Sequence, residues 1–246
     1  MLCQWLYHIT DLAFFDGRLF RAGMAALFSI VLVLTLMPRY IRYLQSKDAT
    51  SDFDKDKKVK APPIMGGLLL VVIVEFVSLI FCKMNGYTIS TLAILAAFSS
   101  VGAIDDLAKI KAKRLIAHGK LEAAKYMEKA DGISSSLRLF LYFLFSLLVA
   151  IFCYKFIPDL RGQLTVPFCP VSVFQIHLPN WAFIGFMTFV IAASGNGTNF
   201  TDGLDSLVSV PIITSMIFVG FVAYVSGNFI FSEYLRVPFL PGCDEL

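Results

Sequence analysis

The chain has 246 residues, of which 57% are hydrophobic and 16% are charged, and its mean hydropathy is +0.73. These values exclude an ordinary soluble domain and indicate an all-α, polytopic integral membrane protein. The net charge of +3 is small, so we expect no nucleic-acid partner.

Six apolar runs are long enough to cross a bilayer, since a helical span needs about 20 residues. In chain order they lie at residues 19–37, 64–82, 88–104, 137–157, 180–194 and 204–225. We therefore expect about six transmembrane helices in a single membrane domain that covers residues 1–246.

The basic residues are concentrated in two of the segments between these runs. Of 21 Lys and Arg residues, 15 lie in segments 38–60 and 105–138. By the positive-inside rule both segments are cytoplasmic, which places the N-terminus outside. Alternation of the spans then places the polar run 195–203 in the cytoplasm as well. Residues 109–130 form either an amphipathic helix at the headgroup level or a solvated helix.

Two adjacent acids, Asp105 and Asp106, follow the third apolar run. Neighbouring side chains on a helix diverge by about 100°, so the two carboxylates have separate tasks. One accepts a proton or binds a metal, while the other orients a neighbour, because close like charges raise one another's pKa. The alternative is that both are ordinary acids that mark a helix end.

Carboxamides and carboxylates recur every three residues before the sixth run, at Asn196, Asn199, Asp202 and Asp205. If a helix begins at Asn199, three of these groups share one face. A helix N-terminus beside several glycines suits an anion or a metal-bound phosphate. The alternative is a plain N-cap at Thr201 or Asp202.

Lys57, Lys58 and Lys60 precede two prolines and the pair Gly66-Gly67 at the second run. These lysines are placed to bind a diphosphate or an anionic lipid head, or they only set the topology. The acidic and basic sets all fall on one membrane face by span counting. That arrangement suits a Mg²⁺-dependent transfer involving phosphates. A transporter would instead place its acids near the bilayer midplane.

These motifs, in this order, resemble the polyprenyl-phosphate N-acetylhexosamine-1-phosphate transferases, and most closely the members that transfer phospho-N-acetylmuramoyl pentapeptide. The matching segments are 63–67, Asp105-Asp106 with Lys109, 199–205, and 235–242 with its following acids. The resemblance implies that undecaprenyl phosphate attacks a UDP-linked muramoyl pentapeptide, which forms lipid I and releases UMP. The implied setting is peptidoglycan synthesis, and hence cell shape and division, at the cytoplasmic face of the bacterial inner membrane.

Carried over by position, the resemblance implies Mg²⁺ as cofactor and assigns roles to individual residues. Asp105 is the expected base and Asp106 its partner, with Asp202 as a third catalytic residue. Asn199 and Asp202 are the expected metal ligands. The expected substrate-binding residues are Lys60, Arg138, Asn196, Gly203 and Asp205.

The chain also departs from the family pattern. The family continues for about four further spans, with a later metal-binding Asp and a histidine-rich loop, so we expect an N-terminal portion. The family's Thr-Pro-Thr-Met-Gly-Gly is Pro-Pro-Ile-Met-Gly-Gly at residues 62–67. Three alternatives stay open: an N-acetylglucosamine-1-phosphate transferase, a cation-coupled transporter, and an inactive scaffold. The oligomeric state is also open, with a homodimer as one option.

Overall fold

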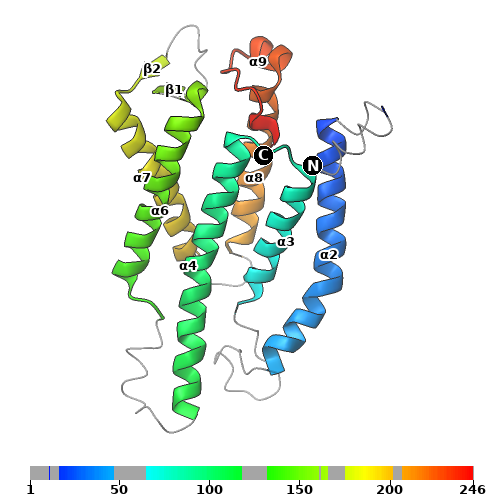
Figure 1. Ribbon diagram of the computed structural model, residues 1–246, viewed down its shortest axis with the longest axis vertical. Helices are drawn as coiled ribbons and strands as arrows, with labels where there is room; N and C mark the ends of the chain where they lie inside the picture. Colours follow the sequence, from blue (N-terminus) through cyan, green and yellow to red (C-terminus); the bar gives the residue numbers. More distant parts are fainter. Residues whose placement is uncertain are drawn as a thin grey trace.

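The computed structural model describes residues 11, 17–46, 65–117, 132–160, 162–165, 175–201 and 207–245. Six long helices run side by side along its long axis (Figure 1). They are α2 (Arg18–Ser46), α3 (Gly66–Phe81), α4 (Gly86–Ala117), α6 (Ser135–Phe156), α7 (Asn180–Thr201) and α8 (Ser209–Gly227). Helices α2, α4 and α7 finish at the lower end of Figure 1, where α3, α6 and α8 begin.

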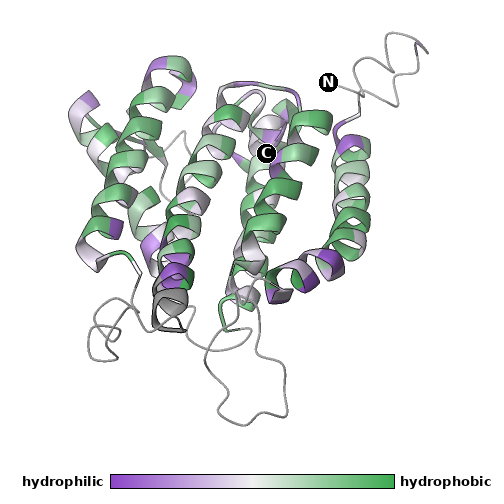
Figure 2. Cartoon of the chain, turned by 60° about the horizontal axis from the view of Figure 1, so that its bottom comes forward, coloured by the Kyte–Doolittle hydropathy of each residue, from purple (hydrophilic) through white to green (hydrophobic). Residues whose placement is uncertain are grey.

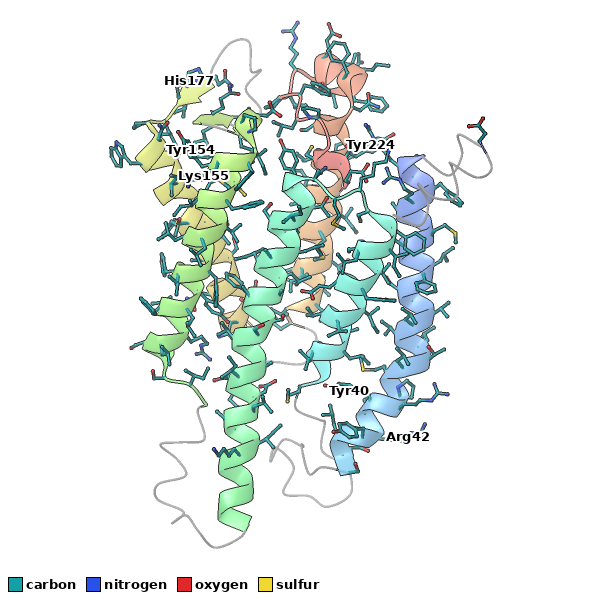
Figure 3. The ribbon with its side chains drawn as sticks, in the orientation of Figure 1. Tyr40, Arg42, Tyr154, Lys155, His177 and Tyr224 are labelled. Carbon is teal, nitrogen blue, oxygen red and sulfur yellow. The ribbon has the colours of Figure 1, made fainter. Side chains whose placement is uncertain are left out.

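Short elements connect the helices toward the opposite, upper end. They are η2 (Pro158–Leu160), α9 (Phe229–Leu235), η3 (Cys243–Glu245) and the antiparallel strands β1 (Gln163–Thr165) and β2 (Gln175–His177). His177 of β2 and Tyr224 near the end of α8 both lie in this part of the molecule (Figure 3). The fold is therefore helical throughout its membrane-crossing part.

The six long helices confirm the fold class predicted from the six apolar runs. Four of them, α2, α4, α6 and α8, are long and apolar enough to cross a membrane. Helix α3 is apolar but has 16 residues, and α7 carries polar residues in its last turns. Hydrophobic residues dominate the helix shafts in Figure 2. The chain is thus an all-α, multi-pass membrane protein.

Two helices continue beyond the ends that the apolar runs predicted. Helix α2 passes through Pro38 to Ser46 and bends in its lower part (Figure 1). Proline lacks an N–H, and its ring displaces the preceding turn, which bends a helix without necessarily ending it. The third apolar run ends at residue 104, which is also short of the observed end of its helix. Helix α4 continues to Ala117, because Ile110 is buried against Leu44 of α2.

Neighbouring helices pack through small apolar clusters. Ile73, Val77 and Phe81 of α3 are buried and pack against Ala25 and other residues of α2. In the upper half, Tyr87 and Cys153 belong to a second buried cluster. Helix α6 packs against both α4 and α7. These contacts fix α4, α6 and α7 beside one another, which matters for the site described below.

A folded-back segment, residues 236–245, closes the upper end, and we call it the upper strap. It begins at Arg236, whose φ of 54° terminates α9. The Leu240 backbone N–H donates to the Ser226 carbonyl at 2.8 Å, and the Asn85 side chain donates to the Gly242 carbonyl at 2.7 Å. The upper strap therefore ties the ends of α8 and α9 to the turn between α3 and α4.

Candidate functional site

Two of the predicted site residues, Asp105 and Asn199, lie at a similar depth. An α-helix rises about 1.5 Å per residue, so the stretches from Gly86 to Asp105 and from Asn180 to Asn199 are each about 30 Å long. That length equals the thickness of the hydrocarbon core of a bilayer. Asp105 and Asn199 therefore both lie about one bilayer thickness below the upper ends of their helices, toward the lower end of the bundle.

Asp105 is buried, with 5% of its surface exposed, and connects α4 to α6. Its carboxylate accepts a hydrogen bond from the Ile133 backbone N–H at 2.8 Å. It also lies 2.7 Å from the Lys109 ammonium and 3.9 Å from the Arg138 guanidinium. Two cations and a backbone donor hold this carboxylate in one position, so Asp105 fixes the entry into α6.

Gly132 makes this arrangement possible. Its φ is +74°, and a Cβ placed there would overlap the Asp105 carboxylate. Only glycine tolerates both the left-handed backbone and the close approach. The next residues start α6 directly, because the Ser134 side chain caps the helix by accepting from the Leu137 N–H at 3.3 Å.

Asp106 faces a cavity of about 870 Å³ at the lower rim, which we call the lower cavity. Five helices supply its walls: Gly66 from α3, Gly102 from α4, Tyr142 from α6, Asn199 from α7, and Met216 from α8. Asp105 is not among its lining residues. The two adjacent carboxylates therefore point in different directions, as the helical geometry predicted, and Asp106 is the one placed to meet a ligand.

The start of α3 contacts Asp106 through an unusual turn. Met65 precedes α3 with a φ of 70°, a left-handed conformation that costs a residue other than glycine about 1–2 kcal/mol. The Tyr40 hydroxyl donates to the Met65 carbonyl at 3.2 Å, and the Met65 backbone also forms a hydrogen bond with Asp106. Tyr40 lies on the lower part of α2 (Figure 3). The turn that precedes Gly66-Gly67 is thus held between α2 and α4.

The prediction that a helix begins at Asn199 is wrong. Helix α7 continues through Thr201, so Asn199 lies in its last turn. Two threonine hydroxyls in these turns find their hydrogen-bond partners inside the helix. Thr198 donates to the Ser194 carbonyl and Thr201 to the Gly197 carbonyl, each at 2.9 Å. A helix C-terminus carries partial negative charge. This end of α7 therefore favours a cation, whereas a helix N-terminus would have favoured a bare anion.

A residue that the sequence did not single out, Phe98, forms the wall between α4 and α7. A Cβ added at Gly195 would overlap its ring, so the ring rests directly on this glycine. The Phe98 ring also packs against Tyr142, with ring centroids 4.7 Å apart. The sequence does contain a clue to Tyr142. It follows the predicted site residue Arg138 by one helical turn and therefore lies on the same face of α6.

Some predicted site residues are not brought into the lower cavity, and others cannot be placed. Asn196 lies on α7 but does not line the lower cavity, and Arg138 lies beside Asp105. The predicted positions outside the described residues are Lys60, Asp202, Gly203 and Asp205. Within the described part of the chain, no group of three or more His, Cys, Asp or Glu side chains converges on a point that suits a metal ion.

The donor set of the lower cavity nevertheless has a definite chemistry. It combines the Asp106 carboxylate with the Asn199 carboxamide at the carbonyl-rich end of α7. Oxygen ligands of this kind suit Mg²⁺, which usually keeps several waters and shares its remaining positions with substrate phosphates. The lower cavity can therefore supply part of a magnesium–phosphate site.

Comparison with known proteins identifies relatives of this chain. The curated relatives that this chain matches include phospho-N-acetylmuramoyl-pentapeptide-transferases of a Nitratiruptor species, Sulfurimonas denitrificans and Campylobacter jejuni. They are 29%, 32% and 32% identical to it over 100%, 96% and 98% of this chain. The chain spans 64–66% of their length, so it corresponds to about their N-terminal two thirds. The profile of glycosyl transferase family 4 matches residues 88–237, which contain Asp105, Asp106 and Asn199. On that match, which covers more than half of its length, the chain belongs to glycosyl transferase family 4.

Proposed function

We propose that this chain acts in a phosphoglycosyl transferase of peptidoglycan synthesis. The reaction moves phospho-N-acetylmuramoyl pentapeptide from its UDP derivative to undecaprenyl phosphate, and it yields lipid I and UMP. The name shared by the relatives supports this substrate pair. The observation that carries the proposal is the lower cavity, where Asp106 and Asn199 face the same space at the membrane rim.

The depth of the lower cavity suits a reaction between one water-soluble and one lipid-bound substrate. In the proposed reaction a phosphate oxygen of the lipid attacks the β-phosphorus of the sugar nucleotide, and the bond to UMP breaks. A site at the rim meets the lipid phosphate where headgroups lie, while the nucleotide enters from water. Helices α2 and α4 end at this rim within the basic segments 38–60 and 105–138, which supports a cytoplasmic orientation in the inner membrane.

We assign different roles to the two acids. Asp106 faces the lower cavity, so it accepts the proton of the lipid phosphate and helps to hold the reacting groups. Asp105 acts through its neighbours, because it fixes Lys109 and the start of α6. This division places the base at Asp106, whereas the resemblance alone had placed it at Asp105.

Magnesium fits the donor set as a proposed cofactor. Asp106 and Asn199 would hold it, with Asp202, which follows α7, as the expected further ligand. Bound Mg²⁺ supplies neutralisation of the charge on the diphosphate. The protein's own part is to place oxygen ligands at the rim and to keep the Asp106 carboxylate toward the lower cavity.

Replacement of Asp106 tests the proposal. Residues 1–246 are co-expressed with the last third of the Campylobacter jejuni relative, so that the full family length is present, and UMP release is measured. We expect Asp106→Asn to lower kcat about 100-fold or more, as loss of a general base does. Glu233→Gln is the matched control, since Glu233 is exposed on α9 at the upper end. Equal UMP release by the two variants would exclude the proposed role.

A further inference from the structure

The bend in α2 brings a tyrosine to the edge of the lower cavity. Pro38 lies inside α2, and beyond it the helix turns so that Leu44 is buried against Ile110 of α4. Tyr40, two residues after the proline, and Met65 both pack against this buried pair. Figure 3 shows Tyr40 on the lower part of α2, beside the start of α3. A side chain of α2 therefore reaches the turn that leads into α3.

Residues 65–68 form this turn, and we call it the Met65 turn. The Met65 carbonyl accepts two hydrogen bonds, from the Tyr40 hydroxyl at 3.2 Å and from the Leu68 backbone N–H at 3.3 Å. The Met65 backbone also forms a hydrogen bond with Asp106. Its N–H is the donor there, because an ionised carboxylate only accepts hydrogen bonds. One residue thus connects the Tyr40 hydroxyl on one side to Asp106 on the other.

The conformation of Met65 needs support from its neighbours. Its φ is 70° and its ψ is 17°, in the left-handed region where the Cβ comes too close to the following carbonyl oxygen. The Met65 side chain makes no capping hydrogen bond to α3. A residue other than glycine keeps such a conformation only where its surroundings fix it, and residues of this kind cluster at functional sites. The Tyr40 hydroxyl supplies a fixed donor of this kind.

Asp106 requires a restraint of its own. Its carboxylate faces the lower cavity and its side chain is only partly buried, so burial alone does not fix its rotamer. A catalytic group has to stay within about 0.5 Å of its productive position. The neighbouring Asp105 carboxylate is held by Lys109 and the Ile133 N–H. For Asp106 the Met65 N–H supplies the backbone donor.

We infer that Tyr40 is a positioning residue for Asp106. Its hydroxyl holds the Met65 turn in the left-handed conformation, and the Met65 N–H then directs the Asp106 carboxylate toward the lower cavity. Met65, Gly66 and Gly67 line the same cavity, so the Met65 turn is also part of the wall that a substrate meets. The inference rests on the proposed function, because it takes Asp106 as the base, and it adds a residue that acts only through Met65.

Removal of the hydroxyl tests the inference. Tyr40→Phe keeps the ring that packs in the cluster and removes only the donor. Tyr43→Phe is the matched control, since Tyr43 lies on the same part of α2 and is 57% exposed. UMP release is measured with residues 1–246 and the co-expressed last third of the Campylobacter jejuni relative. We expect Tyr40→Phe to lower kcat about 5- to 10-fold and to change KM for the sugar nucleotide less than about twofold, whereas Tyr43→Phe matches wild type.

Two further measurements separate positioning from a general loss of structure. Asparagine adopts the left-handed conformation more readily than methionine, because its short polar side chain can hydrogen-bond locally. In a Met65→Asn background the turn depends less on the hydroxyl, so Tyr40→Phe should lower kcat there by about twofold or less. Hydrogen–deuterium exchange needs no activity. The peptide covering residues 65–70 should exchange about threefold or more faster in Tyr40→Phe than in Tyr43→Phe, since the Met65 turn opens more often.

The possible results distinguish this inference from the proposed function. Equal exchange rates in Tyr40→Phe and Tyr43→Phe would overturn the inference, because the hydroxyl would then not hold the Met65 turn. An equal loss of kcat in the wild-type and Met65→Asn backgrounds would overturn it as well. A normal kcat in Tyr40→Phe beside an inactive Asp106→Asn removes the positioning role alone. If Asp106→Asn releases UMP as fast as wild type, the proposed function fails, and the positioning role fails with it.

Discussion

The ion pair between Arg21 and Glu245 is predicted to be the contact that most stabilises the upper end. Its side chains are 4% and 8% exposed, and two hydrogen bonds of 2.5 and 2.6 Å join the guanidinium to the carboxylate. Removing one partner of a buried pair leaves the other charge uncompensated, which costs about 3–5 kcal/mol. For a domain of this size, each kcal/mol lowers the apparent Tm by about 2–4 °C. We therefore expect Arg21→Gln to lower the Tm by about 6 °C or more.

The upper end also provides the control and the reporter for this measurement. The control is Glu233→Gln, because Glu233 is exposed on α9 in the same region and its replacement is expected to change the stability by about 0.5 kcal/mol or less. Arg18 does not serve as a control, since its partner Asp244 is fully buried. Burial raises the pKa of the Cys243 thiol to about 11, which keeps it protonated and slow to react. Melting in detergent is followed with a thiol-reactive fluorophore, which labels Cys243 and buried Cys153 only as they become exposed.

The same pair predicts how stability depends on pH. Burial by itself raises the pKa of Glu245, but the Arg21 guanidinium and the Lys83 backbone N–H outweigh burial and hold this pKa below its ordinary value. A carboxyl whose pKa is lower in the folded state contributes stability above its unfolded pKa of about 4.3 and loses that contribution on acidification. The difference in Tm between wild type and Arg21→Gln should therefore become smaller below about pH 4. Equal Tm values for the Arg21→Gln and Glu233→Gln variants at neutral pH would refute the reasoning.

Two glycine substitutions probe the candidate site. Gly132→Ala places a Cβ against Asp105 at a φ of +74°, so it should destabilise the protein by about 1–3 kcal/mol, measured by the same thermal assay. Gly195→Ala should displace the Phe98 ring and cost about 1–3 kcal/mol. Gly197→Ala, on the same helix with open space around it, should change the Tm little. If the two α7 variants melt together, Phe98 does not rest on Gly195 as described.

The helices and their order follow from local signals in the sequence. Apolar runs of spanning length give their number and place without any knowledge of tertiary contacts. The separate directions of Asp105 and Asp106 also follow from the helical repeat alone. The motifs at Asp105-Asp106 and Asn199 indicated the family, and the family match confirms it.

Contacts between distant segments have no local signal. Nothing in the sequence near Asp105 indicates that its partners include the backbone 28 positions away at Ile133. The end of α7 was misplaced because glycine and asparagine normally favour turns, whereas here the helix continues through Thr201 and the threonine hydroxyls bond to carbonyls within it. The contact of Phe98 with Gly195 likewise depends on how α4 and α7 approach one another. Helix identity is thus a local property of this chain, whereas the shape of the lower cavity is a global one.

The upper strap has a consequence for biogenesis. Arg21 belongs to the first described helix to leave the ribosome, and its partner Glu245 is translated 224 residues later. At about 5–20 residues per second, that separation corresponds to about 10–45 s of synthesis. During this interval the nascent chain holds an arginine at the start of α2 whose carboxylate has not yet been made. Closure of this end is therefore a late event, and a ribosome stalled before codon 245 leaves α2 able to pack on α3 but without its ion pair to Glu245.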